Sequence, residues 1–189
     1  MHAWACALFL IVAFVFAGIV QTAWFAAPVS QRFAIPLDAG VSLRGRRLFG
    51  EHKTLRGFVV MVPAAAAVFV LLALAIGDTA AAGLWPLTIA GYARLGALAG
   101  FGFMAGELPN SFMKRQLGIR PGASARGTLA AVAQFAIDRL DSGIGMLMAV
   151  TLAAPTPLAT WPIVLAIGPS FHWGFSVLMF QLGLKARPA

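Results

Sequence analysis

The sequence predicts an all-α integral membrane protein. Hydrophobic residues make up 60% of the 189-residue chain and charged residues 11%, and the mean hydropathy is +0.87. This composition lies far outside the range of soluble globular proteins. Several apolar runs are also long enough to cross a hydrocarbon core of ~30 Å, which takes ~20 residues of helix. We therefore expect about five transmembrane helices in one membrane-embedded domain covering residues 1–189.

The expected spans are residues 3–27, 58–76, 84–105, 129–154 and 161–184. The first is too long for the apolar region of a cleavable signal, roughly 7–15 residues, and has no basic segment before it, so we expect it to be retained. Cys6, the sole cysteine, lies in this span and predicts no disulfide. The fourth run carries three charges in its first part. Polar segments 28–57 and 106–138 are expected to be cytoplasmic loops.

Basic residues are confined almost entirely to alternate connections. Every Lys and Arg except Arg94 lies within residues 28–57, in the segment after the third span, or at the C-terminus. Basic loops stay in the cytoplasm, so the N-terminus is expected outside and the C-terminus inside, in a multi-pass protein of the inner (cytoplasmic) membrane. That rule and anionic lipid headgroups explain the net charge of +8. Nucleic-acid binding is not expected, because no aromatic residues are interleaved with the basic side chains in these short loops.

Acidic residues gather on the same side as the bases. Asp78 alone lies elsewhere, and acids contribute little to topology, so their gathering needs another cause. A polar site at the inner face is the simplest one. The acids that share the cytoplasmic side with the bases are Asp38, Glu51, Glu107, Asp138 and Asp141.

The segment from Pro36 to Gly57 is basic, interrupted by glycines and without helical periodicity. Backbone amides in such a loop, with Lys53 and Arg56 beside them, can surround phosphate oxygens. It is not a Walker A loop, because His52 precedes the lysine and no strand is expected before it. The alternative is a loop that serves only topology and binds lipid headgroups.

The segment after the third span has a more informative spacing. Pro109 suits the first turn of a new helix, which would place Ser111 and Arg115 on one face with Lys114 beside them. Asp138 and Asp141, three residues apart, predict two carboxylates on one face of the fourth helix. Such a pair near the bilayer repels unless a divalent cation or nearby bases compensate it. The alternative is a pair of solvated carboxylates.

Together these motifs resemble the integral membrane CDP-diacylglycerol synthases, and more closely their small relatives, the CDP-archaeol synthases, which have five spans. The similarity is collinear along nearly the whole chain and therefore more specific than any single motif. The alanine-rich composition suggests a bacterial member. The matching segments are Pro36 to Gly40, Gly45 to Gly50, Lys53 to Gly57, Gly106 to Arg115, Asp138 to Asp141, His172, and Gly183 to Lys185.

Four positions depart from the family pattern. Glu107 stands where the family has Asp, which keeps a metal ligand but lengthens it by one methylene. Gln116 replaces a basic residue. Ala26 and Ala27 stand where an Asn is expected before Pro28, and Ser176 stands for an Asn after His172.

The resemblance implies an enzyme that transfers CMP from CTP to a membrane lipid phosphate monoester, giving a CDP-lipid and pyrophosphate. It implies Mg²⁺, or Mn²⁺, held by Asp138, Asp141 and Glu107, with Lys114 as a further catalytic residue. Chemistry of this kind depends on positioning and charge neutralisation. The residues implied to bind CTP and the lipid phosphate are Asp38, Lys53, Thr54, Arg56, Ser111 and Arg115.

Two other interpretations stay open. A small transporter, channel subunit or assembly factor would also have polar loops at the headgroups, although transporters usually place charges within spans and often show repeats. Only Arg94 and His172 lie well inside the expected spans, and no repeat is visible. The second open interpretation is a family member that binds CTP or lipid without turnover. The lipid type, nucleotide preference, metal count and any homo-oligomer are left open.

Overall fold

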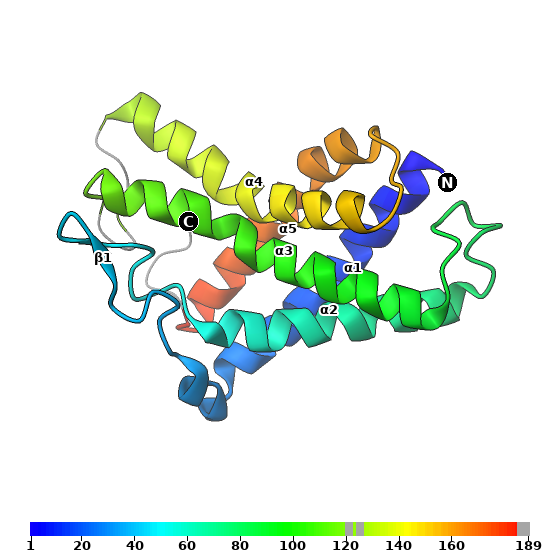
Figure 1. Ribbon diagram of the computed structural model, residues 1–189, viewed down its shortest axis with the longest axis horizontal. Coiled ribbons are helices and arrows are strands. Elements are labelled where there is room, and N and C mark those ends of the chain that lie inside the picture. Colours follow the sequence, from blue (N-terminus) through cyan, green and yellow to red (C-terminus); the bar gives the residue numbers. More distant parts are fainter. Residues whose placement is uncertain (120–122, 124–126, 185–189) are drawn as a thin grey trace.

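The computed structural model describes residues 1–119, 123 and 127–184 (Figure 1). Its helices are α1 (Ala3–Ala26), α2 (Leu55–Ile76), α3 (Ile89–Gln116), α4 (Thr128–Ala153) and α5 (Thr160–Gln181). The prediction of a mainly helical chain is confirmed. By length and composition alone, α1, α2 and α5 qualify as membrane spans among the described residues. Helices α3 and α4 are longer, with 28 and 26 residues, but each carries charged residues.

The helices form a closed ring. Helix α2 packs between α1 and α3, α4 packs between α3 and α5, and α5 returns to contact α1. The ring is filled at one end by an aromatic cluster, in which the Phe9 ring lies 5.1 Å from Phe69, 5.9 Å from Trp85 and 5.6 Å from Tyr92. At the other end the ring encloses a cavity. The apolar core therefore closes one end of the bundle and leaves the other available for a site.

Glycines set the close approach of α3 to its two neighbours. A Cβ atom on Gly96 or Gly100 would collide with the backbone of α2, and one on Gly102, Gly106 or Gly145 would collide with backbone across the α3–α4 crossing. Small residues four apart allow this packing, which is common between membrane helices. The crossing at Gly106 and Gly145 fixes how the following turns of α3 and α4 face each other.

The connection between α1 and α2 contains a short 3₁₀ helix, η1 (Pro28–Phe33), and a hairpin of β1 (Ser42–Leu43) and β2 (Arg46–Arg47). Ser42 pairs with Arg47 and Leu43 with Arg46. The two turn residues, Arg44 and Gly45, have φ of 52° and 74°, as a type I′ hairpin turn requires. The loop then runs back to α2 through a bridge between Pro36 and Thr54.

Three sequence expectations need correction. Pro109 does not begin a new helix: it lies inside α3, which continues to Gln116, because a helix can absorb one missing N–H where its neighbours hold it in place. Residues 106–138 are therefore not one loop, since α3 occupies the start of that range and α4 begins at Thr128. The third apolar run also starts as a non-helical connection, and α3 begins only at Ile89.

Candidate active site

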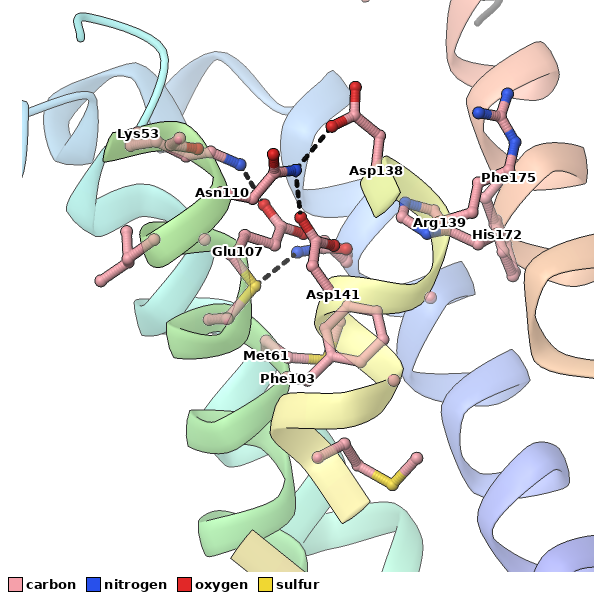
Figure 2. Close-up of a pocket in the computed structure, with 18 of the residues that line it drawn as sticks. Lys53, Met61, Phe103, Glu107, Asn110, Asp138, Arg139, Asp141, His172 and Phe175 are labelled. Carbon is pink, nitrogen blue, oxygen red and sulfur yellow. Dashed lines mark hydrogen bonds and ion pairs between the residues drawn. The ribbon is translucent and has the colours of Figure 1, made fainter. Parts of the chain in front are cut away.

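The α3–α4 crossing brings the predicted carboxylates together. On α4, Asp138 and Asp141 point toward α3, where the Asn110 amide nitrogen donates to Asp138 Oδ1 at 2.6 Å and to Asp141 Oδ2 at 2.8 Å (Figure 2). Their spacing of three residues puts both on one helix face, as the sequence predicted. One amide group thus holds the two carboxylates toward a single point.

Two lysines balance this negative charge. Lys114 Nζ lies 2.6 Å from Asp138 Oδ1, and Lys53, from the loop before α2, forms an ion pair with Glu107. Burial lowers the pKa of Lys53, but Glu107 and the two aspartates outweigh it and raise that pKa above its ordinary value. Lys53 therefore stays charged at neutral pH and joins the loop to α3.

Ser142 connects the third carboxylate to the pair. Its hydroxyl donates to Glu107 Oε1 at 2.8 Å and lies 3.3 Å from Asp141 Oδ1, and its own side chain is buried. Glu107, Asp141 and Asp138 consequently form one continuous network through Ser142 and Asn110. The three residues expected to bind metal are brought into the same site.

The donor chemistry of this network suits Mg²⁺ or Mn²⁺, because hard divalent cations prefer carboxylate and amide oxygens. Asp138 and Asp141 converge, whereas Glu107 is turned toward Lys53 and Ser142. Across the part of the chain that the structure describes, no three His, Cys, Asp or Glu side chains form a ready metal-ligand group. The site therefore offers a divalent cation two converging ligands, Asp138 and Asp141, and a third carboxylate, Glu107, that is paired with other residues.

The predicted arginines have different surroundings. Arg56 donates to Phe25 O and Ser30 Oγ, and its guanidinium lies 4.5 Å from the centre of the Phe25 ring. Arg56 leaves one buried guanidinium nitrogen, Nε, without a hydrogen-bond partner among the described residues, whereas Arg115 leaves two, Nε and Nη1. Buried donors of this kind are costly unless a ligand satisfies them. Arg115 is therefore the stronger candidate of the two for an anion.

Asp38 lies apart from the other site residues. Its side chain is fully buried and accepts from the backbone N–H of Gly40, Phe49 and Gly50 at 3.0 to 3.2 Å and from Arg47. Burial opposes ionisation, but these donors hold the pKa of Asp38 well below its ordinary value. Asp38 holds the loop in shape and is absent from the cavity wall.

The cavity has a volume of about 960 Å³ and two chemically distinct parts. Its polar part is lined by Lys53, Thr54, Arg56, Glu107, Asn110, Ser111, Lys114, Arg115, Asp138 and Asp141. Its apolar part continues between the helices, and Figure 2 shows Met61 and Phe103 below Glu107 and Asp141. The apolar wall includes Leu10, Phe14, Met61, Phe103, Met146, Val164, Phe171 and Phe175.

Sequence reasoning missed two polar residues of the site, Asn110 and Ser142. Each lies within a turn of a predicted residue, Asn110 after Glu107 and Ser142 beside Asp141. Read with α3 as one helix, Asn110 falls on the same face as Glu107 and Lys114. The assumed helix break at Pro109 hid this alignment.

Comparison with known proteins identifies the family. The family model described as CarS-like, CDP-archaeol synthase, matches residues 8–188. The chain belongs to the CDP-archaeol synthase family. The resemblance expected from the motifs is thereby confirmed.

Among the relatives, the CDP-archaeol synthase of Methanopyrus kandleri is 35% identical over 81% of this chain and 79% of its own length. That of Halobacterium salinarum is 33% identical over 81% and 82%. A solved structure, described as structural insight into an intramembrane enzyme for archaeal membrane lipids biosynthesis, is 26% identical, covers 92% of both chains and has a TM-score of 0.57. The chain is accordingly a membrane protein with several apolar helices.

Proposed function

We propose that this protein transfers CMP from CTP to the phosphate monoester of a membrane lipid, producing a CDP-lipid and pyrophosphate. The observation that carries the proposal is the two-part cavity: carboxylates and lysines at its polar end, continuous with an apolar space between the helices. A nucleotide triphosphate suits the polar end and a lipid suits both. A transporter or a headgroup-binding protein has no need for two carboxylates held together by Asn110.

The side chains have distinct roles in this reaction. Lys114 and Arg115 neutralise the phosphates of CTP, while Lys53 and Arg56 act on the same side from the loop and the start of α2. Ser111 and Thr54, on the cavity wall, donate hydrogen bonds to phosphate oxygens. Together they hold the lipid phosphate oxygen in line with the α-phosphorus of CTP, and such positioning supplies much of the rate. Asp38 contributes indirectly by shaping the loop.

Asp138, Asp141 and Glu107 would hold Mg²⁺ or Mn²⁺, with Asn110 and Ser142 orienting the carboxylates. When bound, the ion polarises phosphoryl oxygens and offsets the charge that develops on attacking and leaving groups. Glu107 has to leave Lys53 to join, which frees the Lys53 ammonium for a phosphate. In the ion pair, Lys53 occupies the place of the metal ion beside Glu107, and Glu107 occupies the place of the phosphate beside Lys53.

We also propose a single domain with five membrane spans in the inner membrane, the N-terminus outside and the C-terminus cytoplasmic. The bundle supports this count because α3 packs against the apolar helix α2 and α4 packs against the apolar helix α5. Reporters fused at each terminus test it: a C-terminal reporter on the outer side would contradict the proposal, because the polar site would then face no CTP.

The decisive experiment measures pyrophosphate. Purified protein is incubated with Mg²⁺, each nucleoside triphosphate and a panel of lipid phosphates with ester and ether chains. Pyrophosphate release that requires both CTP and a lipid phosphate, with a matching CDP-lipid, is expected. Binding of CTP without any release would instead favour a family member that has lost turnover.

A further inference from the structure

Gln21 is a polar side chain of α1 that the proposed reaction leaves unexplained. It lines the cavity and is half-buried, in a helix that is otherwise almost wholly apolar. Its neighbour Thr22 is satisfied within the helix, because its hydroxyl donates to Gly18 O at 2.8 Å. Gln21 donates instead to the Met104 sulfur at 3.5 Å, and a thioether is a weak acceptor.

The contact with Met104 fixes the depth of Gln21 in the cavity. Met104 precedes Glu107 by three residues on α3, which is about 4.5 Å along the helix axis. On α1, Gln21 lies one turn deeper than Phe25, whose carbonyl accepts from Arg56. It lies two turns above Phe14, which stacks on Phe103 with ring centres 4.9 Å apart. Gln21 therefore lies at the boundary between the polar and apolar parts.

Lipid chemistry places only one kind of group at such a boundary. If the phosphate binds among Lys53, Lys114 and Arg115, the next polar atoms toward the hydrocarbon are the oxygens that link the chains to glycerol. These oxygens are acceptors, and an ester carbonyl is a stronger acceptor than an ether oxygen. The half-buried Gln21 amide, whose acceptor is a weak thioether, is matched to a stronger acceptor, since a poorly paired polar group within the membrane is costly.

We propose that Gln21 is a specificity-determining residue that donates a hydrogen bond to a chain-linkage oxygen of the lipid phosphate, with ester carbonyls preferred over ether oxygens. This inference rests on the proposed function for the identity of the ligand. It concerns lipid binding alone and involves no bond-making step. Met104 then holds the amide in place until a lipid replaces the sulfur as acceptor.

Binding to the purified full chain in detergent tests it without requiring turnover. The probes are dioleoyl phosphatidate, its dialkyl ether analogue with the same chains, and glycerol 3-phosphate, which lacks chain linkages. Gln21→Met, nearly the same shape without the donors, should weaken phosphatidate binding about fivefold, or ~1 kcal/mol for one hydrogen bond. Ether-lipid affinity should fall less than twofold, and glycerol 3-phosphate affinity should not change.

Two further variants sharpen the result. Thr22→Val removes the adjacent hydroxyl and should leave the ester-to-ether ratio unchanged. Gln21→Asn keeps an amide but shortens its reach, so it should lose the ester preference as Gln21→Met does. If Gln21→Met fails to fold, the lipid preference of Gln21→Asn still tests the inference. Where turnover is measured, the KM for phosphatidate should rise while kcat and the KM for CTP stay constant.

Equal weakening of ester and ether lipids in Gln21→Met, or wild-type ester preference in Gln21→Asn, would overturn the inference and leave the proposed function intact. Failure of the proposed function has a different signature: lipid phosphates bind with the expected preference, yet no pyrophosphate forms with CTP. Wild-type protein that binds both lipids equally would also overturn the role of Gln21.

Discussion

The two walls of the cavity are built differently. On one side, α2, α3 and α4 meet backbone to backbone at glycines that leave no room for a Cβ. On the other side, α5 has only three buried residues, Thr160, Val164 and Ser176, and its contact with α1 includes the Phe175 ring packed on Gly18. One wall is a close backbone contact, and the other is a layer of large apolar side chains.

The difference follows the division of chemistry. Phosphoryl transfer depends on charged groups held to within a fraction of an ångström, and every carboxylate of the site lies on α3 or α4. Hydrocarbon chains need apolar volume without exact geometry, and α5 lines that part of the cavity. We therefore expect changes in the glycine-packed wall to abolish turnover and changes in α5 to alter lipid preference.

The largest expected effect comes from the carboxylates. Asp138→Asn or Asp141→Asn should reduce pyrophosphate release by at least about 100-fold, because loss of a metal ligand removes several kcal/mol of transition-state stabilisation. Each variant should still insert and purify. Asp78→Asn, an exposed acid on the far connection, is the control and should be unchanged. Comparable release from Asp141→Asn would contradict the metal assignment, and Glu107→Asp, which restores the family residue, should keep or raise activity.

The second effect tests the packing itself. Gly106→Val or Gly145→Val should push α3 and α4 apart, with an overpacking cost of about 1–3 kcal/mol. Each variant should have a lower Tm, and its turnover should fall at least about tenfold. Gly174→Ala on α5 is the matched control, since a Cβ there meets nothing within 4 Å. Normal turnover in Gly106→Val would show that the crossing does not fix the site.

The third separates phosphate binding from topology. Arg is a planar two-pronged donor and Lys a compact point charge, whereas membrane topology counts them equally. Lys114→Arg and Arg115→Lys should therefore insert normally but raise the KM for CTP or lower kcat about tenfold, or ~1.4 kcal/mol. Wild-type kinetics in both would move the triphosphate site toward the loop before α2.

The fourth concerns the loop. Asp38→Ala leaves four donor groups without their acceptor, so the free energy of unfolding should fall by about 2–4 kcal/mol. Turnover should recover at low temperature, where the variant stays folded. Because the folded pKa of Asp38 lies below its ordinary value, its stabilisation is complete above that ordinary value, ~3.9, and is lost only as pH falls toward the folded pKa. Direct substrate binding by Asp38 would instead raise KM at every temperature.

The smallest effect belongs to α5. Phe175→Ala removes the ring that lies on Gly18 and widens the apolar part of the cavity. We expect less than about a threefold change in kcat, with a shift toward lipids with bulkier chains, measured by competition between short and long acyl chains. A loss as large as that of Asp141→Asn would end the distinction between the two walls.

The sequence was sufficient to locate four of the five helices and to place Asp138 and Asp141 on one helix face, while the roles of the site residues stay a prediction. Apolar runs located α1, α2, α4 and α5 to within a few residues, and the spacing of Asp138 and Asp141 gave their shared face. It was insufficient where tertiary contacts override local preference. Pro109 favours a helix start locally, yet packing carries α3 through it, and that continuity aligns Asn110 with the aspartates. The role of Asp38 depends on contacts with residues up to twelve positions away, which local spacing does not reveal.

The closed ring has a consequence for how the protein is made. In the proposed five-span arrangement, the chain is synthesised from the N-terminus and its segments enter the membrane in order, so α1 to α4 are in place before α5. All the proposed metal ligands and phosphate-binding residues lie before α5, and α5 is the helix that bridges α4 back to α1. Until it inserts, the charged groups face an open bilayer. During synthesis the site is therefore assembled before it is enclosed, and insertion of the fifth helix is the step that shields it from lipid.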